Sequence, residues 1–149
     1  VLLIAREIDL AFGGRDESVG RRWRTRVQAA GRAPGEFFPI GLLLADEASR
    51  FEGAGLCRHR SLLLKYVLDR FQVCPCAVLD GVCVPEGTED VGSLRQLLGG
   101  ADHMWNVVRA HEKNFLCDIM NAPETLQTAE DLQKQSDSDG RHWEYLRIE

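Results

Sequence analysis

The chain has 149 residues, of which 44% are hydrophobic and 28% are charged, and its formal net charge is −5. These values fit one soluble globular domain with a substantial core. The acidic balance disfavours a nucleic-acid partner, because phosphate binding requires a basic surface. The longest apolar run, at 37–45, is far shorter than the ~20 residues of a membrane-spanning helix. Because the first residue is Val, we expect a piece of a longer protein.

The first third of the chain, residues 1–52, is predicted to be helical. An apolar face at 2–12 predicts a first helix, which Gly13-Gly14 ends. A second, arginine-rich helix is expected to continue to about Arg26, with its charges on a solvated face. A further helical segment is expected at 42–48.

The central helix is predicted within 55–71, where no Gly or Pro interrupts the sequence after Gly55. Helical periodicity places Cys57 with Leu64 and Leu68 on a covered side that takes more than half of the circumference. Arg60 points into this apolar sector, so its guanidinium needs carboxylate or carbonyl partners. The candidate carboxylates are Asp118, Asp46 and Glu47.

Residues 76–120 are predicted to form strands. Two short strands flank Asp80-Gly81, which is expected to be a turn or a bulge. A loop at 85–100 follows, with a short helical stretch at 91–98. From 127 the sequence becomes polar, which indicates a flexible tail whose final segment adds an edge strand or docks on the domain.

An antiparallel hairpin is predicted from strands at 103–108 and 115–119. Alternation places His103 and Trp105 on one face of the first strand. A hairpin of this length brings Asp118 beside His103. The sequence therefore predicts one α+β domain over 1–126, with an antiparallel sheet, followed by the polar tail at 127–149.

A thiol, an imidazole and a carboxylate occur in the order Cys57, His103 and Asp118. A Cys in the first turn of a helix gains acidity from the free N–H groups and the helix dipole. A neighbouring His takes the proton of such a thiol, and a carboxylate orients the His. The alternative is that Cys57 is a small core residue, since cysteine in an apolar helix is commonly buried for packing.

Five cysteines at irregular spacing indicate reduced thiols rather than a disulfide framework. Cys74-Pro75-Cys76 is C-x-C, whereas structural zinc sites use C-x-x-C. Adding Cys83 and His103 would supply four ligands, but any chain with five cysteines offers such sets. We therefore expect neither a metal nor a cofactor.

Taken together, the motifs resemble the transglutaminase-like domains of the papain-like superfamily. The branch they resemble is found in plant enhanced-disease-resistance kinases and in armadillo-repeat ciliary proteins. The resemblance covers about 37–126, and three stretches carry it: GLCRHRSLL at 55–63, HMWNVV at 103–108 and DIMNAPETL at 118–126.

The resemblance implies a papain-like fold, in which N-terminal helices and a Cys-bearing central helix pack on an antiparallel sheet. It implies Cys57 as the nucleophile, His103 as the general base and acid, and Asp118 as the orienting carboxylate. The reaction would be attack on a carboxamide or peptide carbonyl through a thioester, released to water or to an amine.

Other residues are expected to support this site. Trp105 shares the strand face of His103 and would shield it. Arg58 and Arg60 would anchor carboxylates, and a cation near the thiol would also favour the thiolate. His59 is expected to make a structural hydrogen bond or to lie at the surface. An oxyanion hole would need the Cys57 N–H and a second donor, which the sequence does not identify.

Two functions follow from the resemblance. Branch members with a kinase or an armadillo array look regulatory or structural, and some carry Ser at the position of Cys57. We therefore predict an interaction, scaffold or regulatory module of a larger intracellular, cytoplasmic protein, with the cilium or axoneme as the location for armadillo-repeat members. Its partners would be other protein segments, in its parent chain or in an assembly. The alternative is an active cysteine amidase, protease or acyl transferase.

Overall fold

The structure is a computed structural model that describes residues 1–15, 18–32, 39–46, 52–85, 103–128, 134–136 and 142–147. Within these ranges the helices are α1 (Leu2–Ala11), α2 (Val19–Ala29), the 3-10 helix η1 (Ile40–Leu43) and α3 (Cys57–Arg70). The strands are β1 (Cys76–Pro85), β2 (His103–Ala110), β3 (Lys113–Cys117), β4 (Gln127–Thr128), β5 (Lys134–Ser136) and β6 (His142–Arg147). The predicted class, α+β with an antiparallel sheet, is confirmed.

The described strands form one sheet in the order β4-β3-β2-β1-β6-β5, and every neighbouring pair is antiparallel. The predicted turn at Asp80-Gly81 is wrong, because β1 runs through it as a single strand. The first part of β1 pairs with β2 and the second part pairs with β6, and Gly81 belongs to both registers. The apolar residues after Gly81 therefore pair with β6, and the chain does not turn back at Asp80-Gly81.

In the part of the predicted polar tail that the structure describes, residues 134–136 and 142–147 are strands, so the strand predicted for the final segment is present. Strands β5 and β6 both join the sheet, and β6 lies between β1 and β5 rather than at the edge. The cause is the free flank that β1 presents beyond Gly81, since Val82 pairs with Leu146 and Val84 with Glu144. This pairing carries Tyr145 to the middle of the molecule, where it is buried.

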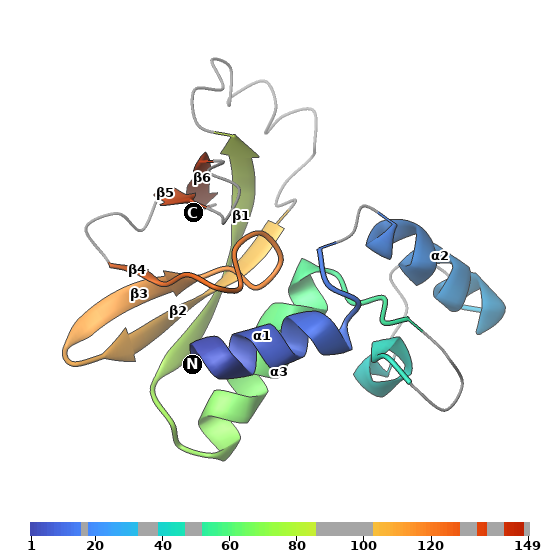
Figure 1. The fold of residues 1–149 in the computed structure, drawn as a ribbon, viewed down its shortest axis with the longest axis horizontal. Helices are drawn as coiled ribbons and strands as arrows, with labels where there is room; N and C mark the ends of the chain where they lie inside the picture. The colour runs from blue at the N-terminus through green and yellow to red at the C-terminus, as the bar shows by residue number, and fades with distance from the viewer. Residues whose placement is uncertain are drawn as a thin grey trace.

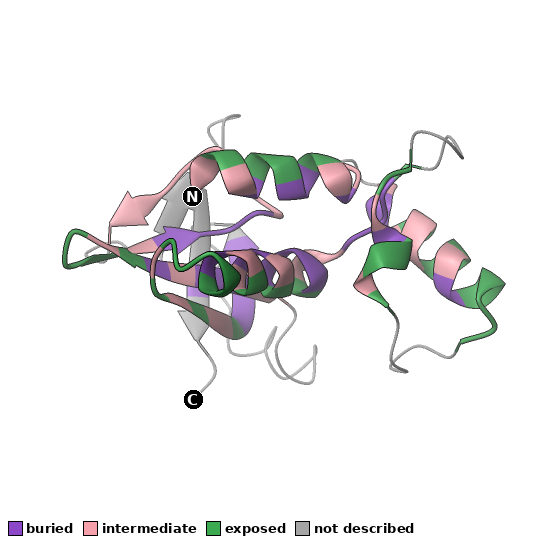
Figure 2. Cartoon of the chain, turned by 90° about the horizontal axis from the view of Figure 1, so that it is seen from below, coloured by how far each residue is buried: buried purple, intermediate pink, exposed green. Residues whose placement is uncertain are grey.

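Helix α3 covers one face of the sheet, and α1 packs on α3 (Figure 1). The core on this side joins both helices to alternate positions of β2 and β3: Ala5, Ile8, Phe12, Leu43, Ala54, Leu64, Leu68, Val108, Cys117 and Ile119. Leu64 and Leu68 are fully buried, as their helical spacing predicts. The buried positions of α1 face the rest of the molecule, and its exposed positions face away (Figure 2). None of the helices in the described ranges combines the length and apolar character needed to cross a bilayer.

The predicted helix at 42–48 is replaced by the short helix η1, after which Leu44 is extended. The backbone here bonds to other segments, because Ala54 N–H donates to Leu43 O and Ala45 N–H donates to Ala11 O. A continuing α-helix would use these groups internally. Part of the predicted segment, and the predicted helix at 91–98, lie outside the described residues.

Just before α3 begins, the backbone at Gly55 packs closely against Phe12. A Cβ atom built on Gly55 would lie 2.2 Å from two ring carbons of Phe12. Gly55 N–H also donates to Phe12 O at 3.1 Å, which holds the two backbones together. A glycine at this position therefore allows the first residue of α3 to lie close to the end of α1.

We expect Gly55→Ala to lower the free energy of unfolding by about 1–3 kcal/mol, the usual cost of forcing an extra methyl group into a packed site. Gly20→Ala is the matched control, since a Cβ there meets no atom within 4 Å. That substitution should be neutral or stabilising, because alanine favours a helix by up to about 1 kcal/mol over glycine. Urea denaturation measures both variants. Equal stabilities would contradict the close approach of Gly55 to Phe12.

Candidate active site

Cys57 is the first residue of α3, and Leu56 before it is extended. Leu56 N–H donates to His59 Nδ1 at 3.0 Å, so the imidazole caps the helix start. Burial, followed by the charges of Arg58 and Arg60, lowers the pKa of His59 to about 4, so this ring is a neutral acceptor at physiological pH. The predicted structural hydrogen bond of His59 is confirmed, and it fixes the turn that presents the Cys57 thiol.

Arg60 is fully buried and ties the start of α3 to the end of α1. Its guanidinium pairs with Asp9, which lies 51 positions earlier in the chain. It also donates to three backbone carbonyls: Gly14 O at 2.6 Å, Gly55 O at 2.8 Å and Phe12 O at 3.3 Å. Arg60 therefore supports the site by holding the backbone around the thiol.

Two of the three carboxylate partners predicted for Arg60, Asp118 and Asp46, do not pair with it. Asp118 acts on Arg60 through its charge alone, and Asp46 is not among its partners. Glu47 lies outside the described residues. The packing of α1 on α3 supplies Asp9 instead, a contact between distant segments of the chain.

Arg58 is exposed, and its guanidinium lies 4.9 Å from the centroid of the Trp23 ring. The expectation that Arg58 anchors a carboxylate is therefore not met, because its described contact is a cation–π contact with α2. Such a contact is worth about 0.5–1 kcal/mol at an exposed position.

The β2–β3 hairpin brings His103 and Asp118 together. His111 and Glu112 form its turn with φ angles of 48° and 62°, the left-handed pair of a type I′ hairpin. This turn sets Asn106 opposite Cys117, and one further residue sets Asp118 opposite Trp105. His103 Nε2 then lies 2.7 Å from Asp118 Oδ2. The structure thus places Asp118 beside His103.

Asp118 is fully buried, and both of its carboxylate oxygens accept hydrogen bonds. Oδ1 accepts from Met120 N–H at 2.9 Å and from Asn121 N–H at 3.2 Å. Oδ2 accepts from Tyr145 OH at 2.7 Å, in addition to His103. Burial opposes ionisation of this carboxyl, but the charge and hydrogen bonds of its partners keep its pKa below the ordinary value. Asp118 is therefore an anion held in a fixed orientation.

Two hydrogen bonds join the first turns of α3 to the start of β2. Ser61 Oγ donates to Met104 O at 3.0 Å, and Asn106 Nδ2 donates to Ser61 O at 3.0 Å. Both residues are buried, so these bonds form in a low-dielectric environment, where they are strong. They fix the distance between the helix that carries Cys57 and the strand that carries His103.

The Cys57 thiol lies close enough to the His103 side chain for the imidazole to act on its pKa. Because Nε2 of His103 faces Asp118, Nδ1 is the nitrogen left for the thiol. Burial favours the neutral thiol, but the hydrogen bond and charge of His103, with the backbone N–H groups of Met104 and Arg58, lower its pKa below the ordinary value. Burial also opposes the charge on His103, but Asp118 and Cys57 together raise the pKa of His103 to about 10. The site therefore favours a thiolate–imidazolium pair.

Aromatic rings cover the imidazole on the sheet face opposite α3. Trp105 lies against His103 with the ring centroids 6.1 Å apart and the planes nearly parallel. Tyr145 meets Trp105 edge-on at 5.2 Å. Trp105 and Tyr145 are almost fully buried, so they shield the His103–Asp118 hydrogen bond from solvent.

Sequence reasoning missed three residues of this site: Tyr145, Asn121 and Cys83. Asn121 Nδ2 lies 3.3 Å from Cys83 Sγ and 3.4 Å from His103 Nε2. Asn121 belongs to the motif that begins at Asp118, so its place near the carboxylate had a signal in the sequence. Tyr145 had none, since its position depends on the pairing of β6 with β1. Cys83 entered the sequence analysis only as a possible metal ligand, and its place near His103 depends on the pairing of β1 with β2.

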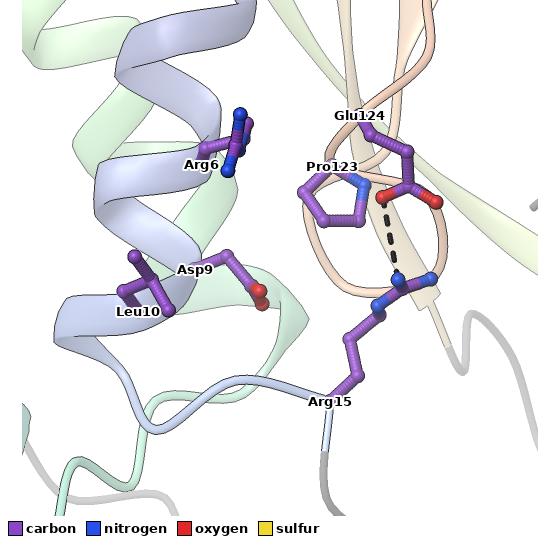
Figure 3. Close-up of a pocket in the computed structure, with 6 residues that line it drawn as sticks. All are labelled: Arg6, Asp9, Leu10, Arg15, Pro123 and Glu124. Atoms are coloured by element: carbon purple, nitrogen blue, oxygen red, sulfur yellow. Dashed lines mark ion pairs between the residues drawn. The ribbon is translucent and has the colours of Figure 1, made fainter. Parts of the chain in front are cut away.

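A cavity of about 340 Å³ lies beside the loop that follows Asp118. Helix α1 forms one wall and the loop forms the other (Figure 3), and the lining residues are Arg6, Asp9, Leu10, Arg15, Pro123 and Glu124. Arg15 crosses the gap to pair with Glu124 at 3.3 Å and donates to Asn121 O at 2.9 Å. The lining includes neither the thiol nor the imidazole, so this cavity adjoins the site without containing its reactive atoms.

Comparison with known proteins gave no match: no protein-family model, no curated protein and no solved structure is similar to this chain. The candidate site therefore has to be interpreted from its own geometry.

Proposed function

We propose that the chain is a transglutaminase-like domain of papain-like fold and that it acts as a cysteine amidase or acyl transferase. The observation that carries this proposal is the hydrogen bond between His103 and Asp118, with Cys57 at the start of α3 near enough for His103 to act on its thiol. The charge state of the site, with a lowered thiol pKa and a raised imidazole pKa, is the state that a thiolate nucleophile requires. A nucleophile on a helix start, with its base and orienting carboxylate on an antiparallel hairpin, supports the family resemblance.

The proposed reaction begins when Cys57 Sγ attacks a carboxamide or peptide carbonyl carbon. A C–S bond forms, and the carbonyl oxygen becomes an oxyanion for which the N–H groups of the first turn of α3 are nearby donors. His103 gives its Nδ1 proton to the leaving amine as the C–N bond breaks, which leaves a thioester. Water or a second amine then attacks the thioester and gives a proton to Nδ1. The C–S bond breaks, which releases the carboxylic acid or the new amide and returns Cys57 to the thiolate. Asp118 holds the Nε2–H throughout.

The test is the rate of iodoacetamide labelling of Cys57 as a function of pH, followed by peptide mass mapping. At about pH 6 an ordinary thiol of pKa ~8.5 is less than about 1% thiolate, so it reacts slowly. Cys57 is expected to label fast at this pH. His103→Gln should slow the labelling by about 10-fold or more, because the neutral amide cannot stabilise the thiolate by charge.

Two controls sharpen this experiment. Cys117 is buried and its pKa is raised to about 12, so it should stay unlabelled in the folded chain and report any unfolding. At about pH 9.5 the labelling rates of the wild type and of His103→Gln should converge, since an ordinary thiol is then largely ionised. A Cys57 that labels as an ordinary thiol in both proteins would end the enzyme proposal.

A second candidate is an interaction or regulatory module of a larger intracellular protein, in which the triad is kept without turnover. The observation that favours it is the exposure of two large apolar side chains one helical turn apart on α3, Leu62 at 50% and Tyr66 at 63%. Such a pair suits contact with another protein segment, in the parent chain or in an assembly partner. Ordinary labelling of Cys57 in the folded domain would leave this module as the function.

A further inference from the structure

We propose that Cys83, His103 and Asp118 form a binding site for Zn²⁺. The three donor atoms, Cys83 Sγ, a ring nitrogen of His103 and a carboxylate oxygen of Asp118, all lie within 4.8 Å of one another. They come from three different segments: strand β1, strand β2 and the residue after β3. Metal binding stands on this geometry alone, whereas its consequence for catalysis rests on the proposed function.

The sheet register explains why the donors converge. Gly81 of β1 is the Cα partner of His103, and Cys83 lies two positions further along β1 on the same face. Gly81 has no side chain, so β1 itself places no side chain between Cys83 and His103. Asp118 reaches the same point from the other side, where its oxygen already meets His103 Nε2 at 2.7 Å.

The donor set suits zinc. Sulfur, imidazole nitrogen and carboxylate oxygen are the ligands of Zn²⁺, which binds them at about 2.0–2.3 Å in a tetrahedron. Tetrahedral ligands at these bond lengths are separated by about 3.3–3.6 Å. Three protein ligands would leave a fourth position for water. To reach these separations, the 2.7 Å His103–Asp118 contact would open by about 0.6 Å, and a donor pair at the 4.8 Å limit would close by about 1.2 Å.

Asn121 marks the place that a cation would take. Its Nδ2 lies 3.3 Å from Cys83 Sγ and 3.4 Å from His103 Nε2, so a polar N–H group lies between these two atoms of the proposed site. The side chain is half-buried and can rotate toward solvent. Its backbone N–H would continue to hold Asp118 Oδ1.

Hydrogen bonds from other residues already orient the Asp118 carboxylate. Tyr145 OH donates to Asp118 Oδ2 at 2.7 Å, and Met120 N–H donates to Oδ1 at 2.9 Å. Partners of this kind fix ligand orientation in metal sites. Binding of Zn²⁺ would release two protons, one from His103 Nε2 and one from the Cys83 thiol, so the net charge of the cluster would not change.

The consequence for the proposed enzyme is inhibition. A metal on Nε2 leaves the remaining proton of His103 on Nδ1, the nitrogen that faces Cys57. The ring then has no free nitrogen to accept a proton from the attacking water. Its Nδ1–H is also a weaker acid than that of an imidazolium. Zn²⁺ would thus remove the acid and the base from the triad while leaving Cys57 in place.

Cobalt(II) tests the site directly, because thiolate coordination gives a sulfur-to-cobalt charge-transfer band that needs no enzyme activity. The full chain, kept reduced, is titrated with Co²⁺ alone and then with Zn²⁺ as competitor. We expect the band in the wild type and its displacement by Zn²⁺. Cys83→Ser and Cys83→Ala should both lose it, with Co²⁺ affinity lowered by at least about 100-fold, the upper end of effects seen for second-shell substitutions.

Cys74→Ser is the matched control, since it removes a half-buried thiol outside the cluster and should keep the band. Cys57→Ser should also keep it, because Cys57 meets the other nitrogen of His103. Circular dichroism verifies that each variant is folded. A wild type without the band, or a band that survives both Cys83 substitutions, would overturn the site. Fast labelling of Cys57 in metal-free protein is a separate result, so the metal site and the enzyme proposal can fail independently.

Discussion

Replacement of Arg60 by methionine is expected to lower the free energy of unfolding by about 3–5 kcal/mol, the cost of breaking a buried ion pair from one side. The side chain of Arg60 is fully buried, and that of Asp9 is 12% exposed. Methionine would leave the Asp9 carboxylate without its partner. It would also leave three backbone carbonyls, Gly14 O, Gly55 O and Phe12 O, without the guanidinium that now donates to them.

Urea denaturation would measure this effect against two further variants. Arg60→Lys keeps the positive charge but loses the planar guanidinium that donates to several acceptors at once, so an intermediate loss of stability is expected. Arg58→Met removes the exposed neighbour whose guanidinium lies over the Trp23 ring, and should cost about 0.5–1 kcal/mol. If Arg60→Met cost no more than Arg58→Met, then the buried pair would not hold α1 to the start of α3.

In a Cys57→Ser background, the free energy of unfolding is expected to fall by about 2–4 kcal/mol between about pH 6.5 and about pH 10. His103 has a raised pKa in the folded chain, about 10 in the intact site. A raised folded pKa gives stability that is fully present below the unfolded value of about 6.5 and is lost as pH rises through the folded value. Asp118, the largest of the influences that raise this pKa, remains in the variant.

The Cys57→Ser background is needed because the lowered pKa of Cys57 makes stability depend on pH in the opposite direction to His103. This lowered pKa gives stability that is present above the ordinary value of 9.0 and is lost as pH falls, so the two groups oppose each other in the wild type. Cys57→Ser with Asp118→Asn is the control, and its stability should be nearly independent of pH over this range. The measurement is urea denaturation at several pH values. Parallel curves for the single and double variants would show that Asp118 does not charge His103.

Local patterns predicted the parts of the site that are close in sequence. The helix that begins at Cys57 has a sequence without Gly or Pro and an apolar side that includes Leu64 and Leu68, both fully buried. The hairpin that joins His103 to Asp118 spans only 15 positions, so strand alternation sufficed to place the two side chains together. These elements follow from short-range periodicity.

Contacts between distant segments could not be predicted. Asp9 pairs with Arg60 across 51 positions, and nothing near Arg60 in the sequence distinguishes Asp9 from the other candidates, Asp46 and Asp118. The error at Asp80-Gly81 has the same origin. A Gly after an Asp is typical of a turn, and only the arrival of β6 beside β1 keeps the strand continuous.

The bond from Tyr145 to Asp118 has a consequence for the time at which the site is completed during synthesis. Tyr145 follows Asp118 by 27 positions and supplies one of the donors to its buried carboxylate. A nascent chain that has already exposed the thiol, the imidazole and the carboxylate still lacks this phenol and the strand that carries it. The buried carboxylate of Asp118 thus reaches its final set of hydrogen bonds only once β6 has left the ribosome, well after the Cys57 thiol has been made.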